Sequence, residues 1–355
     1  MSRFWNPSIR MLHPYVPGEQ PQMANLTKLN TNESPYGPSP KALKAIEEAA
    51  SDTLRLYPDP ASDILREAIA QQFGLARENV FVGNGSDEVL AHAFRALFRD
   101  DEDILFADVT YGFYPVYCTL FGLSYRSVPL RKDFSLKVED YVGPCGGIAI
   151  ANPNAQTGRA ISVSDIEFLL KAQPDRVVII DEAYVDFGAE SAVSLVKHYD
   201  NLIVVRTFSK SSSLAGLRVG YALGDAALIE GLVRVKDSFN SYPLSRLAQA
   251  GATASLLDRE WFLKNTQKIM ATRDRIIPRL EALGFEVLPS KANFILINHP
   301  AHEAIVLAGR LREHGILARH LSSIPRILQW LRVTIGSDEQ CDHLLDVLTR
   351  YLKHK

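Results

Sequence analysis

The chain has 355 residues, of which 46% are hydrophobic and 23% charged, and its formal net charge is −2. This length suits two packed domains, and the balanced charge argues against nucleic acid or an anionic membrane as partner, so small molecules are the expected ligands. The three cysteines are far apart without a CxxC pair, and no segment resembles a signal peptide or a membrane span. We therefore expect reduced core thiols, no metal site and a cytoplasmic protein.

The pattern along the chain predicts an α/β protein in three parts. Residues 1–45, rich in proline and asparagine, are expected to form an arm that packs with the small domain. Residues 46–255 alternate apolar runs with amphipathic stretches, which predicts a large domain with a mostly parallel sheet of seven strands covered by helices. The strands are expected at 79–85, 103–109, 123–130, 146–154, 176–183, 201–210 and 219–224. Residues 256–355 begin with a long helical stretch, and their later strands and helices predict a smaller α/β domain.

The segment GNGSDE, residues 83–88, follows the first of these strands and opens a helix. Backbone N–H groups of Gly85, Ser86 and Asp87 would then point at an anion, and the helix dipole would favour it. The segment is not a dinucleotide fingerprint, because Glu88 stands where the last glycine is needed. A plain turn with a helix cap explains the same residues.

Asp181 directly follows four apolar residues in RVVIIDEAYVDFG, so its carboxylate should emerge at the carboxyl edge of a central strand. A buried charge there needs a partner. A magnesium-binding acid of an ATPase is excluded, because the chain contains no Gly-Lys pair for a phosphate loop. A helix-capping role remains open.

Lys210 ends the apolar strand of NLIVVRTFSK and is followed by serines, glycines and Arg218. A strand-end lysine is often only a solvated terminus. A desolvated lysine amine, however, forms Schiff bases with aldehydes, as in pyridoxal phosphate enzymes, which also need an acid on the pyridine nitrogen and a phosphate site. Asp181 and the GNGSDE turn are candidates for both, and Ser209 and Arg218 add donors for the same phosphate.

These motifs together resemble the aspartate aminotransferase superfamily of pyridoxal phosphate enzymes (fold type I), and within it most closely the histidinol-phosphate aminotransferases. The resemblance runs almost end to end through HPYVPGEQ, LNTNESPYGPSPKAL, LYPDP, VGNGSDEVL, TYGFYPVY, ANPNAQTG, VVIIDEAYVDFG, TFSKSSSLAGLRVGY, SFNSYPL, ANFILI and LRVTIGS. No single one of these motifs is specific for the superfamily, whereas the whole set in this order is.

The resemblance implies a role for each matching residue. Lys210 would hold the cofactor and carry a proton, Asp181 would keep the pyridine nitrogen protonated, and Tyr184 would hydrogen-bond the ring oxygen O3′. Tyr111 would stack on the ring. The cofactor phosphate would be held by Gly85, Ser86, Asp87, Ser209 and Arg218 of one chain and by Tyr57 of the neighbouring subunit, which implies a homodimer.

One segment departs from the family pattern. Relatives usually show asparagine directly before Pro-Thr-Gly, or Asn-Ala-Pro-Thr-Gly, whereas residues 152–158 read NPNAQTG. Gln156 replaces the proline, so a pre-set turn and any preference for a cis peptide are expected to be lost there. Asn154 is the candidate for a second contact to O3′.

The same resemblance implies the substrate. Arg332 matches the arginine that takes a substrate carboxylate, and with Arg319 and Tyr15 it would bind the phosphate of histidinol phosphate; a surface charge is the alternative for Arg319. The expected reaction transfers an amino group from glutamate to imidazole acetol phosphate, giving 2-oxoglutarate and L-histidinol phosphate. An aromatic amino-acid aminotransferase or a threonine-phosphate decarboxylase of the same fold remains open.

A different class of protein, a regulator that only senses pyridoxal phosphate, would need an added DNA-binding segment. The arm is too short and not basic enough for that role. Hydrolase and zinc-enzyme motifs such as G-x-S-x-G and H-E-x-x-H do not occur.

Overall fold

Seven apolar runs between residues 80 and 224 pair into one sheet, as their pattern predicts, in a computed structural model that describes residues 2–21 and 26–353. In spatial order the strands are β2 (Val80–Asn84), β8 (Val219–Gly224), β7 (Leu202–Thr207), β6 (Val178–Asp181), β5 (Gly147–Ala151), β3 (Ile104–Ala107) and β4 (Tyr125–Val128). Only β8 runs antiparallel to its neighbours. The expected mostly parallel sheet is confirmed.

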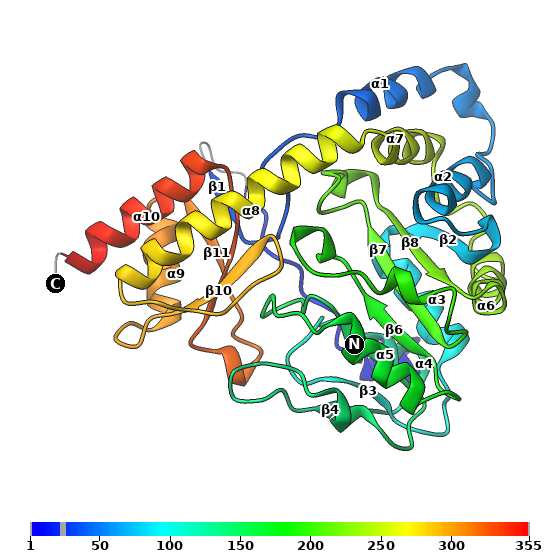
Figure 1. The fold of residues 1–355 in the computed structure, drawn as a ribbon, viewed down its shortest axis with the longest axis horizontal. Coiled ribbons are helices and arrows are strands. Elements are labelled where there is room, and N and C mark those ends of the chain that lie inside the picture. Colours follow the sequence, from blue (N-terminus) through cyan, green and yellow to red (C-terminus); the bar gives the residue numbers. More distant parts are fainter. Residues whose placement is uncertain (1, 22–25, 354–355) are drawn as a thin grey trace.

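Helices cover both faces of this sheet, which explains why its strands are apolar without alternation (Figure 1). In β6, Val178 and Ile180 enter one core and Ile179 enters the other. The first core is shared with α2 (Asp63–Phe73), α5 (Val163–Ala172) and α7 (Arg246–Leu257), and the second with α3 (Gly85–Leu97), α4 (Tyr114–Phe121) and α6 (Ala226–Asp237).

A second sheet of five strands forms the other part of the molecule. Its spatial order is β1 (Thr27–Leu29), β11 (Ile316–His320), β12 (Leu331–Thr334), β10 (Phe294–Asn298) and β9 (Glu286–Val287). Helices α8 (Arg259–Ala282), α9 (Ala304–Glu313) and α10 (Asp338–Lys353) share a core with it. In Figure 1, α8 runs from beside α7 on the large sheet to the small sheet, so one long helix connects the two parts.

The N-terminal residues join the small sheet through β1, which pairs in parallel with β11. The chain then crosses to α1 (Pro40–Ala49), where Ser39 caps the helix and donates to Asp258 at 2.6 Å. Because α1 packs along α7, the expected boundary after residue 45 falls inside a helix of the large part. We propose that the arm ends before Pro40.

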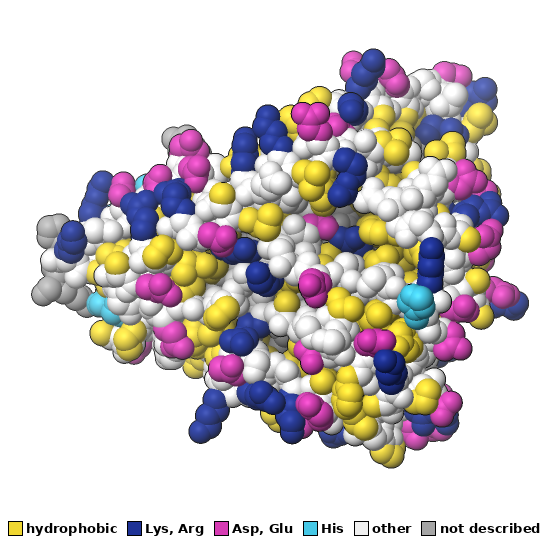
Figure 2. Space-filling model, viewed as in Figure 1, with side chains coloured by type: hydrophobic (Ala, Val, Ile, Leu, Met, Phe, Trp, Pro, Cys, Tyr) yellow, Lys and Arg dark blue, Asp and Glu magenta, His cyan; other side chains and the backbone are white. Residues whose placement is uncertain are grey.

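Short 3-10 helices complete the secondary structure. They are η1 (Pro7–Met11), η2 (Asp52–Arg55), η3 (Arg77–Asn79), η4 (Val138–Tyr141), η5 (Val185–Phe187), η6 (Ala192–Leu195), η7 (Ala215–Leu217) and η8 (Pro325–Ile327). The three cysteines are free and buried, as expected. Charges of both signs are interspersed over the face shown in Figure 2. Within the described ranges, no helix combines the length and hydropathy that a membrane crossing needs.

Candidate active site

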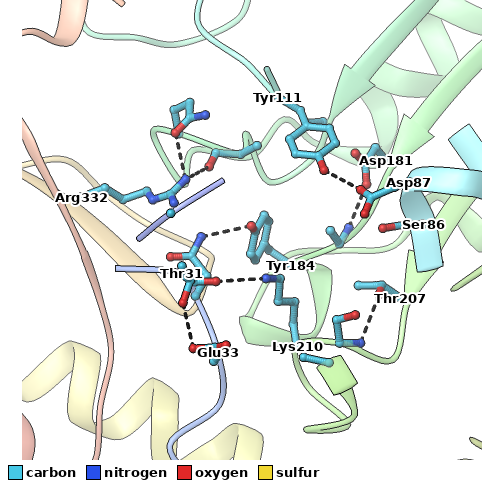
Figure 3. A pocket seen from close by; sticks show the side chains of 18 of the residues that line it. Thr31, Glu33, Ser86, Asp87, Tyr111, Asp181, Tyr184, Thr207, Lys210 and Arg332 are labelled. Atoms are coloured by element: carbon cyan, nitrogen blue, oxygen red, sulfur yellow. Dashed lines mark hydrogen bonds between the residues drawn. The ribbon is translucent and has the colours of Figure 1, made fainter. Parts of the chain in front are cut away.

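A cleft of about 210 Å³ opens where the carboxyl edge of the large sheet faces the small sheet (Figure 3). Parallel strands bring their ends together there, since Ala151 of β5, Asp181 of β6 and Val205 of β7 are in register. Most of the expected site residues line this cleft: Tyr15, Ser86, Asp87, Tyr111, Asp181, Tyr184, Ser209, Lys210, Arg218, Arg319 and Arg332. Gly85, Asn154 and Tyr57 do not.

Asp181 is 4% exposed, and its carboxylate accepts hydrogen bonds from the Tyr114 hydroxyl at 3.0 Å and the Ala183 N–H at 3.2 Å. Among the described residues, no cationic side chain pairs with it. Burial raises the pKa of Asp181 to about 6, although both hydrogen bonds oppose this shift. The site thus holds a carboxyl group that needs a cation, which suits a protonated pyridine nitrogen.

Lys210 reaches the cleft from the turn after β7. Its Nζ donates to the Thr31 carbonyl at 3.3 Å and lies 5.7 Å from the centre of the Tyr184 ring. No carboxylate in the described ranges forms an ion pair with Lys210. Its amine therefore faces the open cleft beside Tyr184 (Figure 3), as a group that attacks an aldehyde must.

The Tyr184 hydroxyl accepts a hydrogen bond from Asn32 Nδ2 at 3.0 Å. Asn32 is almost fully buried, and its Oδ1 accepts from the Thr334 hydroxyl at 3.0 Å. A hydroxyl that accepts from an amide keeps its own proton free for another acceptor. Asn32 lies in the motif LNTNESPYGPSPKAL, which contributes to the family resemblance, but no role was predicted for it from the sequence.

The end of the cleft farther from Arg332 is built from the first turn of α3 (Figure 3). Glu88 turns back to accept from the Asn84 N–H at 2.5 Å, and Asp87 receives Arg218 Nη2 at 2.9 Å. Gly85 has a φ of +82°, which favours glycine, and the Arg218 guanidinium lies close to it, 2.4 Å from where a Cβ would stand. Helix-end N–H groups, a hydroxyl and an arginine gather as an anion site requires.

Tyr111 stands beside this end, and its hydroxyl donates to Asp87 at 2.5 Å. Burial and the Asp87 carboxylate raise the pKa of Tyr111, so the ring stays neutral. Tyr111 also packs edge-on against Tyr114, 5.8 Å between ring centres. The arm adds Tyr15, whose ring stacks on Phe113 at 4.4 Å.

The opposite end of the cleft carries two arginines on adjacent strands. Arg319 of β11 and Arg332 of β12 are directly paired in register, an arrangement that like charges disfavour. Arg319 donates to the carbonyls of Pro17 and Val16 in the arm. Arg332 donates to Ala155 O, Gln156 Oε1 and Asn30 O, while its buried Nε has no partner among the described residues.

Neither arginine forms an ion pair with any described carboxylate. Burial, and to a lesser degree the charge of Arg319, lower the pKa of Arg332. Two guanidiniums facing one cleft, satisfied only by neutral acceptors, form a site for an anionic ligand.

The structure does not bring Asn154 to the cleft. Its Nδ2 donates to Val109 O at 2.8 Å, and its Oδ1 accepts the N–H groups of Gln156 and Thr157, both at 3.0 Å. Its oxygen and one of its amide hydrogens hold the loop, and the O3′ contact stays a prediction. A cis peptide bond lies three residues before Gln156, at Asn152–Pro153, a position for which the sequence analysis made no prediction.

Tyr57 lies on the surface, 78% exposed, where it stacks on Tyr242 at 4.6 Å between ring centres. It is not part of the cleft of its own chain. The contact with a neighbouring subunit therefore stays a prediction.

A buried charge network behind the cleft was missed by the sequence analysis. Arg206 pairs with Asp186 and lies 3.7 Å from Glu182, and Asp186 accepts the Ser211 hydroxyl at 2.6 Å. Burial raises the pKa of Glu182 to about 7, although Arg206 opposes this shift. Glu182 follows Asp181 and Ser211 follows Lys210, so the network holds together the two turns that carry the site.

The donor set fits pyridoxal phosphate: an amine, an unneutralised buried acid, an aromatic wall and an anion cradle meet in one cleft. No group of three or more His, Cys, Asp or Glu side chains in the described ranges has metal-binding geometry. The chain matches the family model of class I and II aminotransferases over residues 24–348. It belongs to this family.

Similar proteins agree with this assignment. The chain is 64% identical to histidinol-phosphate aminotransferase 2 of Gluconobacter oxydans and 61% identical to the histidinol-phosphate aminotransferase of Acetobacter pasteurianus, with 98% of each chain covered. A crystal structure of the Sinorhizobium meliloti histidinol-phosphate aminotransferase in complex with pyridoxal-5′-phosphate has a TM-score of 0.87 at 25% identity, covering 100% of this chain and 99% of that one. The protein is a pyridoxal phosphate-dependent aminotransferase of fold type I.

Proposed function

We propose that this aminotransferase exchanges an amino group between L-histidinol phosphate and 2-oxoglutarate, giving imidazole acetol phosphate and L-glutamate, and works in the reverse direction in histidine biosynthesis. The observation that carries the proposal is the register pair Arg319 and Arg332 at the cleft. A phosphate dianion offers both guanidiniums an acceptor and offsets their repulsion. The names of the relatives at 57–64% identity support the same substrate.

Bound pyridoxal phosphate supplies an aldehyde that amines attack and a ring that withdraws electrons from the substrate Cα. Around it, Lys210 Nζ would provide the attacking amine and later move a proton at the substrate Cα. Asp181 would hold a proton on the ring nitrogen, and the free proton of the Tyr184 hydroxyl would serve O3′. The first turn of α3 with Ser209 and Arg218 would bind the phosphate, and Tyr111 would cover the ring.

We also propose that the enzyme is a cytoplasmic homodimer in which Tyr57 completes the neighbouring site. The segments 54–57 and 239–242 meet through the stacking of Tyr57 on Tyr242, and both are rich in exposed apolar side chains. These are Leu54, Leu56, Tyr57, Phe239 and Tyr242. Contiguous apolar surface of this kind marks protein interfaces, and unpaired thiols are typical of a reducing compartment.

A substrate panel on the purified yellow enzyme tests the proposed substrate. Single-turnover half-reactions with L-histidinol phosphate, L-histidinol, phenylalanine, tyrosine and threonine phosphate give kcat/KM for each amine. We expect histidinol phosphate to exceed histidinol by about a hundredfold or more, because the phosphate forms charge-assisted bonds worth several kcal/mol. Faster reaction of phenylalanine or tyrosine would favour an aromatic aminotransferase, and release of carbon dioxide from threonine phosphate would favour a decarboxylase.

A further inference from the structure

Gln156 bridges two groups of opposite hydrogen-bonding character. Its Oε1 accepts from Arg332 Nη1 at 2.9 Å, and its Nε2 donates to the Thr110 carbonyl at 3.2 Å. A guanidinium only donates and a carbonyl only accepts, so the amide can satisfy both in one orientation alone. A carboxylate of the same length could serve Arg332 but not Thr110, and an apolar side chain could serve neither.

The same bridge leaves the charge of Arg332 intact. The acceptors around the guanidinium are the carbonyls of Ala155 and Asn30 and the amide of Gln156, all of them neutral. Neutral acceptors offset part of the cost of burying a guanidinium without cancelling its charge. The full positive charge therefore remains available to a ligand, next to that of Arg319.

The backbone of Gln156 is itself fixed by a hydrogen bond to Asn154. Its backbone N–H donates to Asn154 Oδ1 at 3.0 Å, and Asn154 is anchored to Val109 O at 2.8 Å. A proline, which the family pattern has at this position, would supply neither this N–H nor the side-chain amide. The departure from the pattern thus adds a connection between the segment that carries Tyr111 and the arginine at the other end of the cleft.

We propose that Gln156 is a positioning residue that orients Arg332 and preserves its charge, so that the cleft favours a dianionic phosphate over a single carboxylate. This inference rests on the proposed function, in which Arg332 receives the phosphate. In physical terms, two uncancelled guanidiniums attract a dianion more strongly than a monoanion, and a negative charge at position 156 reduces the dianion's advantage.

The test compares Gln156→Glu and Gln156→Met in the holoenzyme, using half-reaction kinetics with L-histidinol phosphate and with glutamate. We expect Gln156→Glu to raise KM for histidinol phosphate by about tenfold or more, with kcat changed by less than about threefold, because a ground-state ion pair competes with the substrate. The rise in KM for glutamate should be smaller. Gln156→Met leaves the charge of Arg332 uncancelled but removes the hydrogen bond that orients it. We therefore expect kcat/KM to fall about threefold for both substrates.

Two controls separate this role from a general effect. Gln329→Glu adds the same charge on the surface and keeps the acceptor for the Ala304 N–H, so its kinetics should match the wild type. In an Arg332→Met background, Gln156→Glu should lower kcat/KM clearly less than in the wild type, because no ion pair competes with the substrate and only the repulsion by the new charge remains. Inhibition of the holoenzyme by inorganic phosphate gives a readout without turnover, and Gln156→Glu should weaken it about tenfold.

The inference is overturned if Gln156→Glu leaves KM and phosphate inhibition unchanged, or if it costs as much in the Arg332→Met background as in the wild type. The proposed function is tested separately, by the reaction of the wild-type enzyme with histidinol phosphate. If the wild-type enzyme does not react with histidinol phosphate, that substrate is excluded. The role of Gln156 is then decided by the same cycle with glutamate and by phosphate inhibition.

Discussion

Asp181 shows how one buried carboxyl group can disfavour folding of the empty protein and serve the loaded one. Burial raises its pKa from the ordinary 3.8 to about 6. At pH values between these two, the folded state retains a proton that the unfolded state has released, so the contribution of Asp181 to stability is highest below about pH 4 and is lost as the pH rises through about 6. A cationic ring nitrogen placed against the carboxylate would reverse this effect.

Asp181→Asn should therefore stabilise the cofactor-free protein at high pH. Asparagine keeps the volume without the charge, and the Tyr114 hydroxyl can reverse its hydrogen bond. We expect unfolding in urea to match the wild type near pH 4 and to require about 3 kcal/mol more at pH 8. With cofactor bound, the same variant should lose about three orders of magnitude in transamination rate. A variant that is less stable at pH 8, or one with near-normal turnover, would contradict the role given to Asp181.

Asn32 is a residue whose importance only the structure reveals. Asn32→Asp retains a side chain that tolerates its positive φ and still accepts from Thr334, but it cannot donate to Tyr184. The Tyr184 hydroxyl should then turn its proton to the new carboxylate, and the half-reaction should slow by roughly tenfold, the value of one hydrogen bond. In a Tyr184→Phe background the substitution should add little. Equal losses in both backgrounds would show that Asn32 acts elsewhere.

At the scale of elements, β11 and β12 bring two positive charges together, although no short stretch of the sequence predicts that these residues are neighbours. Their register places Arg319 opposite Arg332, and the arm carbonyls of Val16 and Pro17 cover the outer one. The turns after β6 and β7 are likewise connected through Arg206 rather than through contacts between Asp181 and Lys210 themselves. The register of the small sheet thus places the two arginines, and the Arg206 network connects the two turns of the large sheet.

Arg319→Ala separates phosphate recognition from carboxylate recognition. Removing the outer guanidinium leaves Arg332 for a carboxylate but halves the charge that faces a dianion. We expect kcat/KM for L-histidinol phosphate to fall about thirtyfold or more, and that for phenylalanine to change by less than about threefold. Half-reaction rates on the same preparations measure both. Equal losses would exclude Arg319 as the phosphate-specific residue.

For the whole molecule, the proposed contact of Tyr57 with the neighbouring site predicts an obligate homodimer. Tyr57 is exposed on its own chain, so a hybrid dimer of Tyr57→Ala and Lys210→Ala chains contains one site with both residues intact. We expect each parent to be weakly active or inactive and the mixed, refolded sample to regain activity that rises with the hybrid fraction measured by differential tagging. An enzyme that sediments as a monomer of 39.5 kDa with full activity would contradict shared sites.

The strands and the strand-end residues were predictable because their signals are local. Asp181 and Lys210 each follow a continuous apolar run, and a parallel sheet brings such ends together. The contacts that orient them were not predictable, since Asn32 meets Tyr184 and Gln156 meets Arg332 only after the two sheets have packed. The hydrogen bonds of Asn154 to its own loop were not predictable either, because its motif gave no sign of them.

The attachment of the cofactor to Lys210 is the claim on which the rest depends. Borohydride reduction of the yellow holoenzyme fixes the cofactor to the amine that holds it, and peptide mapping by mass spectrometry then locates the adduct. We predict a single reduced pyridoxyl group on Lys210 in the wild type, and none in Lys210→Ala, which should still bind the cofactor reversibly. An adduct on another lysine, or a wild-type protein that cannot be labelled, would contradict the account.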